Sequence, residues 1–300
     1  MFSLSSWRHL RIPFSYFLLP VFLFAVSVSP NLVKDRLFWV FLLVHLFLYP
    51  ASNGYNSYFD KDEQSIGGLK NPPPVSKGLY YLALLFDAIA ILVGYLKVGL
   101  LFSVMLFVYG LVSKAYSHPS IRLKKYPVQG WIITGLFQGL FTFLMCYAGL
   151  NDFDLSTLFV PQALVPGMLT TMMLWGSYPM TQIYQHEEDL KRGDITLSLR
   201  LGVKGTFYFT ALVFTLAVTG FMYFFITYHS LRYALIFVLA LIPVLIFFGF
   251  WFYQVSKDES AASYSNTMRL NWISSTCLNG FFVYFFLEHS QVLQAIQGGY

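Results

Sequence analysis

The chain has 300 residues, of which 57% are hydrophobic and only 11% are charged. This composition excludes an ordinary soluble domain, because apolar segments long enough to cross a bilayer recur from one end of the chain to the other. We therefore expect an all-α, polytopic membrane protein. The net charge of +5 is typical of loops that meet anionic lipid headgroups, and nothing in the pattern indicates nucleic acid as a partner.

Hydropathy along the chain predicts a bundle of nine membrane-spanning helices with a central cavity. The first apolar run is long, which favours a retained span over a cleaved signal peptide. We expect a cytoplasmic N-terminal segment at 1–12, a membrane domain at 13–288 and a C-terminal tail at 289–300. The predicted spans are 13–30, 37–59, 79–96, 98–114, 128–150, 159–185, 203–229, 231–255 and 269–288.

The positive charges are distributed unevenly between the two ends of these predicted spans. Of the 19 Lys and Arg residues, only Lys34, Arg36, Lys97 and Arg232 fall on the side opposite the N-terminus. By the positive-inside rule the richer side is cytoplasmic. A shift of one span across a loop would scatter these charges, so the bias supports the topology as well as the orientation.

Two acidic clusters lie on the side that is rich in positive charge, at the ends of the second and sixth predicted spans. Carboxylates are hard oxygen ligands suited to Mg²⁺, which usually completes its octahedron with waters and substrate phosphates. The pattern therefore predicts a metal site at the membrane surface and a phosphate-bearing lipid as substrate. The clusters are Asn56, Asp60, Asp62 and Glu63 in the first, and Glu187, Glu188 and Asp189 in the second.

The equivalent positions of the clusters suggest a weak internal repeat of four spans, which would bring them face to face across a cavity. Opposed carboxylates near low-dielectric walls repel one another unless a cation lies between them. The alternative is that these are surface carboxylates paired with Lys61, Lys191 and Arg192, an arrangement that is common and only weakly stabilising. The recurrence of the clusters at matching span ends favours a metal.

Three segments resemble the UbiA-type intramembrane prenyltransferases. Residues 56–64, Asn-Ser-Tyr-Phe-Asp-Lys-Asp-Glu-Gln, resemble the family's first motif, Asn-Asp-x-x-Asp-x-x-x-Asp. Residues 185–202 resemble its second motif, Asp-x-x-x-Asp-x-x-x-Gly-x-x-Thr-Leu, and end in the same Leu-Gly pair. Residues 116–127 resemble the family's basic loop between spans four and five. Nine spans also match, so the resemblance covers the whole membrane domain in the expected order.

The departures from the family pattern fall on expected metal ligands. Ser57, Gln64 and Gln185 stand where the family has carboxylates. Glutamine can still ligate through its carbonyl oxygen. We expect a rearranged ligand set rather than weakened metal binding, because other acids lie close by in the sequence: Asp62, Glu63, Glu187 and Glu188.

The resemblance implies an enzyme that depends on Mg²⁺ and transfers a prenyl group from a prenyl diphosphate to an aromatic, quinone-precursor or other lipophilic acceptor. We expect a bacterial inner membrane, and the distribution of Lys and Arg places the active site on its cytoplasmic side. Asp60 and Asp189 are the expected catalytic residues. The expected Mg²⁺ ligands are Asn56, Asp60, Glu63, Glu188 and Asp189, and the expected diphosphate-binding cations are Lys70, Arg122, Lys124 and Lys125.

Two other functions fit parts of the sequence. Asp87 lies inside the third predicted span, where an acid is costly, and several spans with such an acid are also typical of secondary transporters. A family member that binds an isoprenoid lipid without turnover is the other alternative, which the three missing carboxylates suggest. Acids at one membrane surface favour the enzyme over the transporter.

Overall fold

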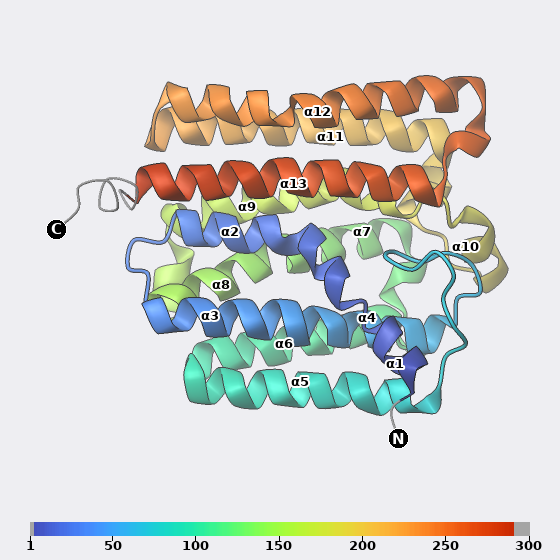
Figure 1. The fold of residues 1–300 in the computed structure, drawn as a ribbon, viewed down its shortest axis with the longest axis horizontal. Coiled ribbons are helices and arrows are strands. Elements are labelled where there is room, and N and C mark those ends of the chain that lie inside the picture. Colours follow the sequence, from blue (N-terminus) through green and yellow to red (C-terminus); the bar gives the residue numbers. More distant parts are fainter. Residues whose placement is uncertain (1–2, 291–300) are drawn as a thin grey trace.

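The computed structural model describes residues 3–290, and the predicted tail at 289–300 lies almost entirely outside them. Apart from an isolated bridge between Ile66 and Leu69, the regular secondary structure of the described residues is helical. The long helices lie side by side in one bundle (Figure 1). The prediction of an all-α membrane protein is confirmed.

Within residues 3–290, eight helical segments are long and apolar enough to cross a membrane. A further helix, α9 (Pro161–Ser177), lies along them but is shorter, and its 17 residues reach only about 26 Å. The predicted count of nine spans is therefore not confirmed. The eight segments are Leu4–Ser27, Lys34–Asp60, Lys77–Lys97, Leu100–Ser117, Pro127–Asn151, Leu197–Tyr228, Leu231–Lys257 and Tyr264–His289.

Some of these segments consist of two or three consecutive helical elements. The helical elements besides α9 are α1 (Leu4–His9), η1 (Ile12–Leu18), α2 (Leu19–Ser27), α3 (Lys34–Leu42), η2 (Leu43–Leu48), α4 (Tyr49–Asp60), α5 (Lys77–Lys97), α6 (Leu100–Ser117), η3 (Leu123–Lys125), α7 (Pro127–Leu136), η4 (Phe137–Phe141), α8 (Thr142–Asn151), η5 (Ser156–Phe159), η6 (Tyr178–Thr181), α10 (His186–Arg192), α11 (Leu197–Tyr228), α12 (Leu231–Lys257), η7 (Glu259–Ala261) and α13 (Tyr264–His289). The predicted division at Lys97 is a tight turn: α5 ends there, and Gly99 takes a φ of +142° before α6 begins. Only glycine adopts such a backbone readily.

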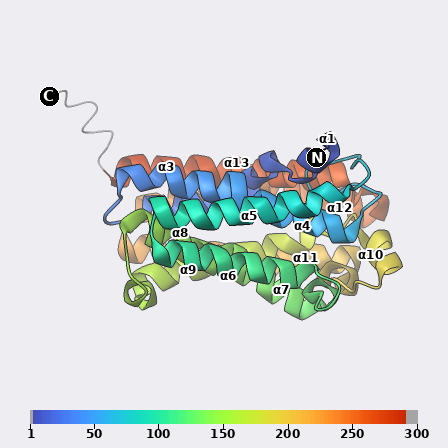
Figure 2. The same cartoon turned by 90° about the horizontal axis from the view of Figure 1, so that it is seen from below.

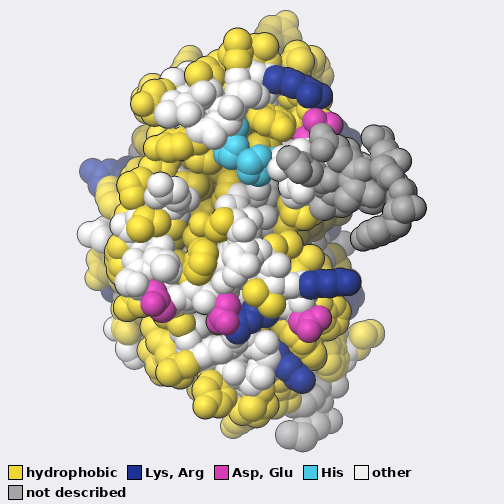
Figure 3. Space-filling model, turned by 90° about the vertical axis from the view of Figure 1, so that its left-hand side faces the viewer, with side chains coloured by type: hydrophobic (Ala, Val, Ile, Leu, Met, Phe, Trp, Pro, Cys, Tyr) yellow, Lys and Arg dark blue, Asp and Glu magenta, His cyan; other side chains and the backbone are white. Residues whose placement is uncertain are grey.

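The two ends of the bundle differ. The short helix α10 and the segments 61–76 and 118–126 all lie at one end, which we call the α10 end (Figures 1 and 2). Figure 3 looks onto the opposite end, where charged side chains are few and hydrophobic ones cover the flanks. The helices thus bring both acidic clusters to the same end of the molecule.

The fifth segment contains a π-helical turn, η4, that shapes the interior. Gly139 allows this turn to approach α9 closely, because a Cβ there would lie 2.6 Å from the backbone of Thr171. The backbone N–H of Leu140 donates to Thr171 Oγ1 over 2.8 Å, which satisfies a donor that the altered helix geometry leaves free. Such π turns occur frequently at functional sites.

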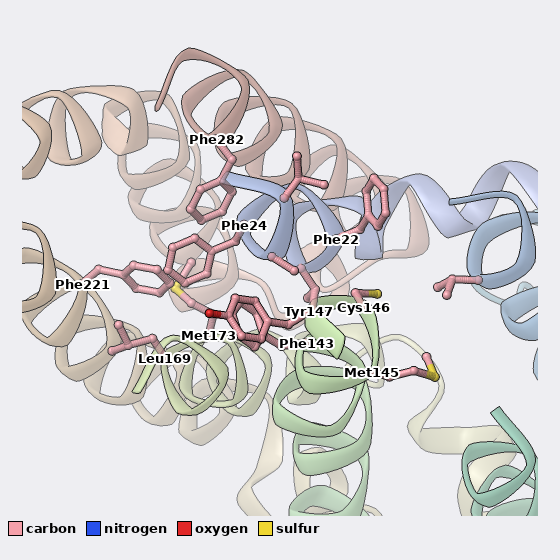
Figure 4. Packing of buried hydrophobic residues seen from close by; sticks show 14 of the residues in the cluster. Phe22, Phe24, Phe143, Met145, Cys146, Tyr147, Leu169, Met173, Phe221 and Phe282 are labelled. Carbon is pink, nitrogen blue, oxygen red and sulfur yellow. The ribbon is translucent and has the colours of Figure 1, made fainter. Parts of the chain in front are cut away.

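An aromatic cluster fills the middle of the bundle (Figure 4). Phe24 of α2 stacks on Phe282 of α13 with ring centroids 4.7 Å apart, and also contacts Phe143 of α8 and Phe221 of α11. These rings are buried. In a membrane, van der Waals packing of such rings stabilises helix association, so Phe24 holds α2 against α8, α11 and α13.

Candidate functional site

A polar cavity of about 220 Å³ opens at the α10 end of the bundle. Its walls come from α4, α6 and α10 and from the segments between them. Four of the predicted site residues line it, namely Asn56, Asp60, Lys124 and Asp189. The fold therefore brings the two acidic segments and the basic loop together, as the sequence pattern predicts.

Asp60 is the last residue of α4, where the helix stops because Lys61 adopts a left-handed conformation with φ of +50°. The Asp60 side chain is only 4% exposed. It pairs with Lys124, and Arg122 Nη2 lies 3.5 Å from Asp60 Oδ1. A buried carboxylate needs such compensation, because an unpaired buried charge is strongly unfavourable.

Asp189 lies on α10, a short helix that ends at Gly193 with φ of +73°. Thr196 Oγ1 donates to its carboxylate over 3.2 Å. No Lys, Arg or His among residues 3–290 forms an ion pair with it. Burial raises the pKa of Asp189 to about 7, against the opposing effect of Lys124 and Arg192. Asp189 is thus a cavity carboxylate whose charge is not neutralised by a direct partner.

The second acidic segment also holds the first one in place. Glu188 Oε1 accepts hydrogen bonds from the backbone N–H groups of Glu63, at 2.9 Å, and Gln64, at 3.3 Å. Arg192 pairs with Asp62 and lies 3.1 Å from Glu188. Burial raises the pKa of Asp62, and the neighbouring Asp60 adds to this rise while Arg192 opposes it.

Asp194 is a site residue that sequence reasoning missed. Its carboxylate accepts two hydrogen bonds from the Arg122 guanidinium, both 2.7 Å long, and Lys124 Nζ lies 3.7 Å away. The side chain is 2% exposed. A bidentate pair of this kind fixes the orientation of the guanidinium. Asp194 lies inside the second motif, but spacing alone does not reveal which cation it faces.

Arg11 is a second cavity residue that was missed, because it lies in the N-terminal segment far from either motif. Its guanidinium donates to the carbonyl of Gly67 over 3.0 Å and to Asn53 over 3.3 Å. No carboxylate in the described part of the chain lies within 4 Å of it. Arg11 therefore presents a positive charge to the cavity without a direct anionic partner.

An apolar cavity of about 220 Å³ adjoins the polar one. Phe14, Tyr109 and Tyr178 line both cavities. The inner end includes Phe221 and Phe282 of the aromatic cluster (Figure 4). Among the residues that the structure describes, no Asp, Glu, Lys, Arg or His lines this second cavity. The pair of cavities suits a molecule with a charged head and a long apolar tail.

Comparison with known families agrees with this geometry. The model of the UbiA prenyltransferase family matches residues 17–273. The chain belongs to the UbiA prenyltransferase family. Members of this family are prenyltransferases, and the chain is an enzyme of that class. The resemblance found in its motifs is thereby confirmed.

Solved structures with the same fold include a UbiA homologue from Archaeoglobus fulgidus. In complex with DMAPP and Mg²⁺ it has a TM-score of 0.66 at 16% identity, covering 94% of this chain and 99% of the homologue. With GPP and Mg²⁺ the TM-score is 0.64, at the same identity and coverage. A digeranylgeranylglyceryl phosphate synthase has a TM-score of 0.60 at 18% identity, covering 94% of this chain and 98% of that one. No curated protein sequence matches the chain.

The remaining predicted site residues of this UbiA-family chain do not line the polar cavity. Glu63 and Lys70 are exposed, and Lys125 lies over the ring of Tyr126 at 4.9 Å. Arg122 is held by Asp194 and Asp60, and Glu188 by backbone groups of the first acidic segment, as described above. Arg122 and Glu188 thus hold the walls of the cavity together. Direct contact of these five residues with metal or diphosphate stays a prediction.

Within residues 3–290, no group of three or more His, Cys, Asp or Glu side chains is arranged to hold a metal ion. The ion pairs explain why. Asp60 faces Lys124, and Asp62 faces Arg192, so two of the cavity carboxylates are turned toward cations of the chain itself. Asp87, the intramembrane acid, pairs with Lys114 between α5 and α6 and lines neither cavity.

Proposed function

We propose that this enzyme transfers a prenyl group from a prenyl diphosphate to a lipophilic acceptor, aromatic or quinone-like, inside the membrane and with the help of Mg²⁺. One observation carries the proposal: Asp60 and Asp189, from distant parts of the chain, line one polar cavity that adjoins an uncharged apolar one. The two Archaeoglobus fulgidus complexes, with GPP or DMAPP and Mg²⁺, support the choice of donor and ion.

The diphosphate of the donor binds in the polar cavity, and its prenyl chain extends into the apolar one. Arg11, Lys124 and Arg192 line the polar cavity and supply positive charge to the phosphate oxygens. Arg11 is the best placed of the three, because it does not have to break an ion pair in order to bind a phosphate oxygen. Lys124 can turn from Asp60 to the substrate while Arg122 remains on Asp60 and Asp194.

The oxygen atoms that line the polar cavity fit a magnesium ion. Asp189 has a carboxylate without an ion-pair partner, and Asn56 donates through Nδ2 to Ser117, which leaves its Oδ1 available as a ligand. Gln182 Oε1, in the same lining, is buried without a hydrogen-bond partner. Mg²⁺ commonly takes one or two carboxylates together with waters and substrate phosphates. Asp60 joins this set once Lys124 has turned to the diphosphate.

The chemistry follows from these positions. The bond between C1 of the prenyl chain and the bridging oxygen breaks, and the diphosphate leaves with both bonding electrons. Bound magnesium neutralises part of the charge that develops on the leaving group. Phe14 and Tyr109 line both cavities, on either side of the position proposed for C1, and aromatic faces stabilise a cation while they exclude water. A carbon of the acceptor then bonds to C1 and loses its proton.

The distribution of charge supports a cytoplasmic active site. Most of the 19 Lys and Arg residues belong to segments at the α10 end, which is the positive-inside signature of a cytoplasmic face. We assign the α10 end to the cytoplasm and the protein to a bacterial inner membrane. Protease protection of the 61–76 segment in oriented membrane vesicles tests this orientation.

Activity in liposomes tests the function itself. Purified protein with geranyl diphosphate, a quinol acceptor and Mg²⁺ is expected to release diphosphate and form a prenylated product. Asp60→Asn and Asp189→Asn should each abolish both signals. Asp154→Asn is the matched control, because Asp154 is an exposed carboxylate on the segment between α8 and η5. Donor retention without diphosphate release by the native chain would contradict the enzyme and favour a lipid-binding protein.

A further inference from the structure

Uncharged polar side chains surround the place where the two cavities meet. Ser52 and Asn53 come from α4, Gln138 from η4 and Thr181 from η6, and all four line both cavities. Asn271 of α13 lines the apolar cavity, one helical turn beyond Met268, which lines the polar one. We call Ser52, Asn53, Gln138, Thr181 and Asn271 the polar collar.

The members of the polar collar differ in whether their side chains have hydrogen-bond partners in the protein. Ser52 bonds to Ser113 over 2.5 Å, Asn53 accepts from Arg11, and Thr181 donates to the carbonyl of Tyr178 over 2.7 Å. The side-chain amides of Gln138 and Asn271 make no hydrogen bond to any of residues 3–290. An amide that faces a largely apolar cavity without a partner loses free energy, so its presence points to a ligand.

The backbone holds Gln138 firmly at this position. It lies on the π-helical turn η4, beside Gly139, whose close contact with Thr171 leaves no space for a side chain. The next residue, Leu140, donates its N–H to Thr171 Oγ1. The turn is therefore locked against α9, and the amide of Gln138 is presented to the cavities by a rigid element. A group held in this way is suited to select among ligands.

We propose that the polar collar binds the acceptor through an uncharged hydroxyl or carbonyl group, with Gln138 as the residue that determines specificity and Asn271 as its partner. This inference rests on the proposed prenyl transfer. A prenyl chain is a hydrocarbon and cannot satisfy either amide. The acceptor must approach C1 of the donor, which lies where the two cavities meet, so its polar group is the one available to them.

The charge pattern selects a neutral group over an acidic one. The apolar cavity has no charged residue among its described lining, and a carboxylate placed there would be buried without a counter-ion. Arg11 is the cavity cation without a carboxylate partner, and it donates to Asn53 of the collar. An acidic acceptor would therefore turn toward Arg11, and a neutral one toward Gln138.

Binding of three naphthalene probes to the purified protein tests the inference without turnover. The probes are naphthalene, 2-naphthol and 2-naphthoate, measured by equilibrium dialysis in detergent. For each variant, the naphthol preference is the Kd of naphthalene divided by the Kd of 2-naphthol. We expect this ratio to be about fivefold higher for the native chain than for Gln138→Leu, which is the effect of one hydrogen bond. Comparison of this ratio between variants cancels the partitioning of the probes into detergent.

Gln254→Leu is the matched control, because Gln254 is an exposed glutamine on α12 outside both cavities, and it should keep the native ratio. An equal naphthol preference in the native chain and Gln138→Leu would overturn the proposal, as would a loss of 2-naphthoate binding in Gln138→Leu as large as the loss of 2-naphthol binding.

Two further measurements separate this inference from the proposed function. If the native chain neither binds nor consumes geranyl diphosphate, the proposed function fails, while the naphthol preference still reports on the polar collar. If the donor is consumed but the hydroxyl preference does not depend on Gln138, only the collar fails. Should Gln138→Leu not fold, Asn271→Leu replaces it, with the same loss of naphthol preference expected and an undiminished preference overturning the proposal.

Discussion

The two cavities are built by different physical means. The polar one lies between α4, α6 and the short helix α10, and buried ion pairs such as Arg122 with Asp194 hold the segments at this end together. Long helices build the apolar one, and packed rings such as Phe24 and Phe282 hold those. Electrostatic defects should therefore damage donor binding and the α10 end, whereas packing defects should alter the length of chain that fits.

The largest expected effect is on the stability of the polar cavity. Asp194→Ala leaves Arg122 buried with only the more distant Asp60 as a partner, and breaking a buried pair costs about 3–5 kcal/mol. Unfolding in detergent, followed by tryptophan fluorescence, measures this loss. The matched control is Asp152→Ala, because the Asp152 carboxylate is 67% exposed in its pair with Arg36 and such a pair is worth less than about 1 kcal/mol. Equal losses in the two variants would contradict a polar cavity held by buried ion pairs.

Arg11→Ala should weaken donor binding without comparable loss of stability. A charge-assisted hydrogen bond to phosphate contributes about 1.5–3 kcal/mol, so the Kd for geranyl diphosphate should rise by about 10-fold to 100-fold. Arg8→Ala, another arginine of the N-terminal segment that lines neither cavity, should leave the Kd unchanged. A native Kd in Arg11→Ala would exclude Arg11 from the diphosphate site.

Metal binding in the polar cavity should depend on pH. Burial raises the pKa of Asp189 from 3.8 to about 7, and a ligand must be ionised, so Mg²⁺ affinity should fall by up to about tenfold per unit as pH drops below about 7. Without metal the sign for stability is opposite. A carboxyl with a raised folded pKa contributes stability that is present at low pH and lost as pH rises toward 7.

Titration calorimetry with Mg²⁺ at several pH values measures the first effect. Asp189→Asn should remove the pH dependence along with most of the affinity. Affinity that stays constant through neutral pH in the native chain would show that Asp189 is not a ligand. No corresponding dependence is expected for prenyl-chain binding, because no Asp, Glu, Lys, Arg or His is among the described lining of the apolar cavity.

The smallest expected effect concerns the apolar cavity alone. Phe221 and Phe282 bound its inner end, so Phe221→Ala should enlarge it and shift preference toward longer donors. We expect the ratio of kcat/KM for farnesyl over geranyl diphosphate to rise about fivefold, since added apolar contact is favourable. Phe250→Ala, at an exposed site on α12, is the control. An unchanged ratio in Phe221→Ala would mean that the chain does not reach this end.

Much of the fold could be predicted from sequence because hydropathy is a local property. The boundaries of the eight long segments agree with the predicted spans to within three residues, apart from Leu4–Ser27, Leu197–Tyr228 and Tyr264–His289, which begin five to nine residues earlier than predicted. The α9 region was predicted as a long span at 159–185, but the helix ends at Ser177 and a 3₁₀ turn with Pro179 follows. Proline restricts the backbone and lacks an N–H donor, so the helix changes geometry there.

Site residues could be predicted from the sequence only where they belong to a motif with a recognisable spacing. Asn56, Asp60, Lys124 and Asp189 line the cavity, and each belongs to a matching segment. The ion pair between Arg122 and Asp194 joins two loops, and the spacing of residues within a motif does not encode such a contact. It was therefore not predicted. Exposed loop charges such as Lys70 carry the correct sign on the correct face, yet sequence does not specify the direction of their side chains.

A double-mutant cycle on donor binding tests most directly whether Asp60 and Asp189 act on one diphosphate. The measurement is the Kd of geranyl diphosphate with Mg²⁺ for the native chain, Asp60→Asn, Asp189→Asn and the double variant. We predict that the double variant binds about as weakly as either single one, because residues of one site are strongly coupled. Losses that simply add, as they should for Asp189→Asn combined with Asp154→Asn, would contradict a shared site.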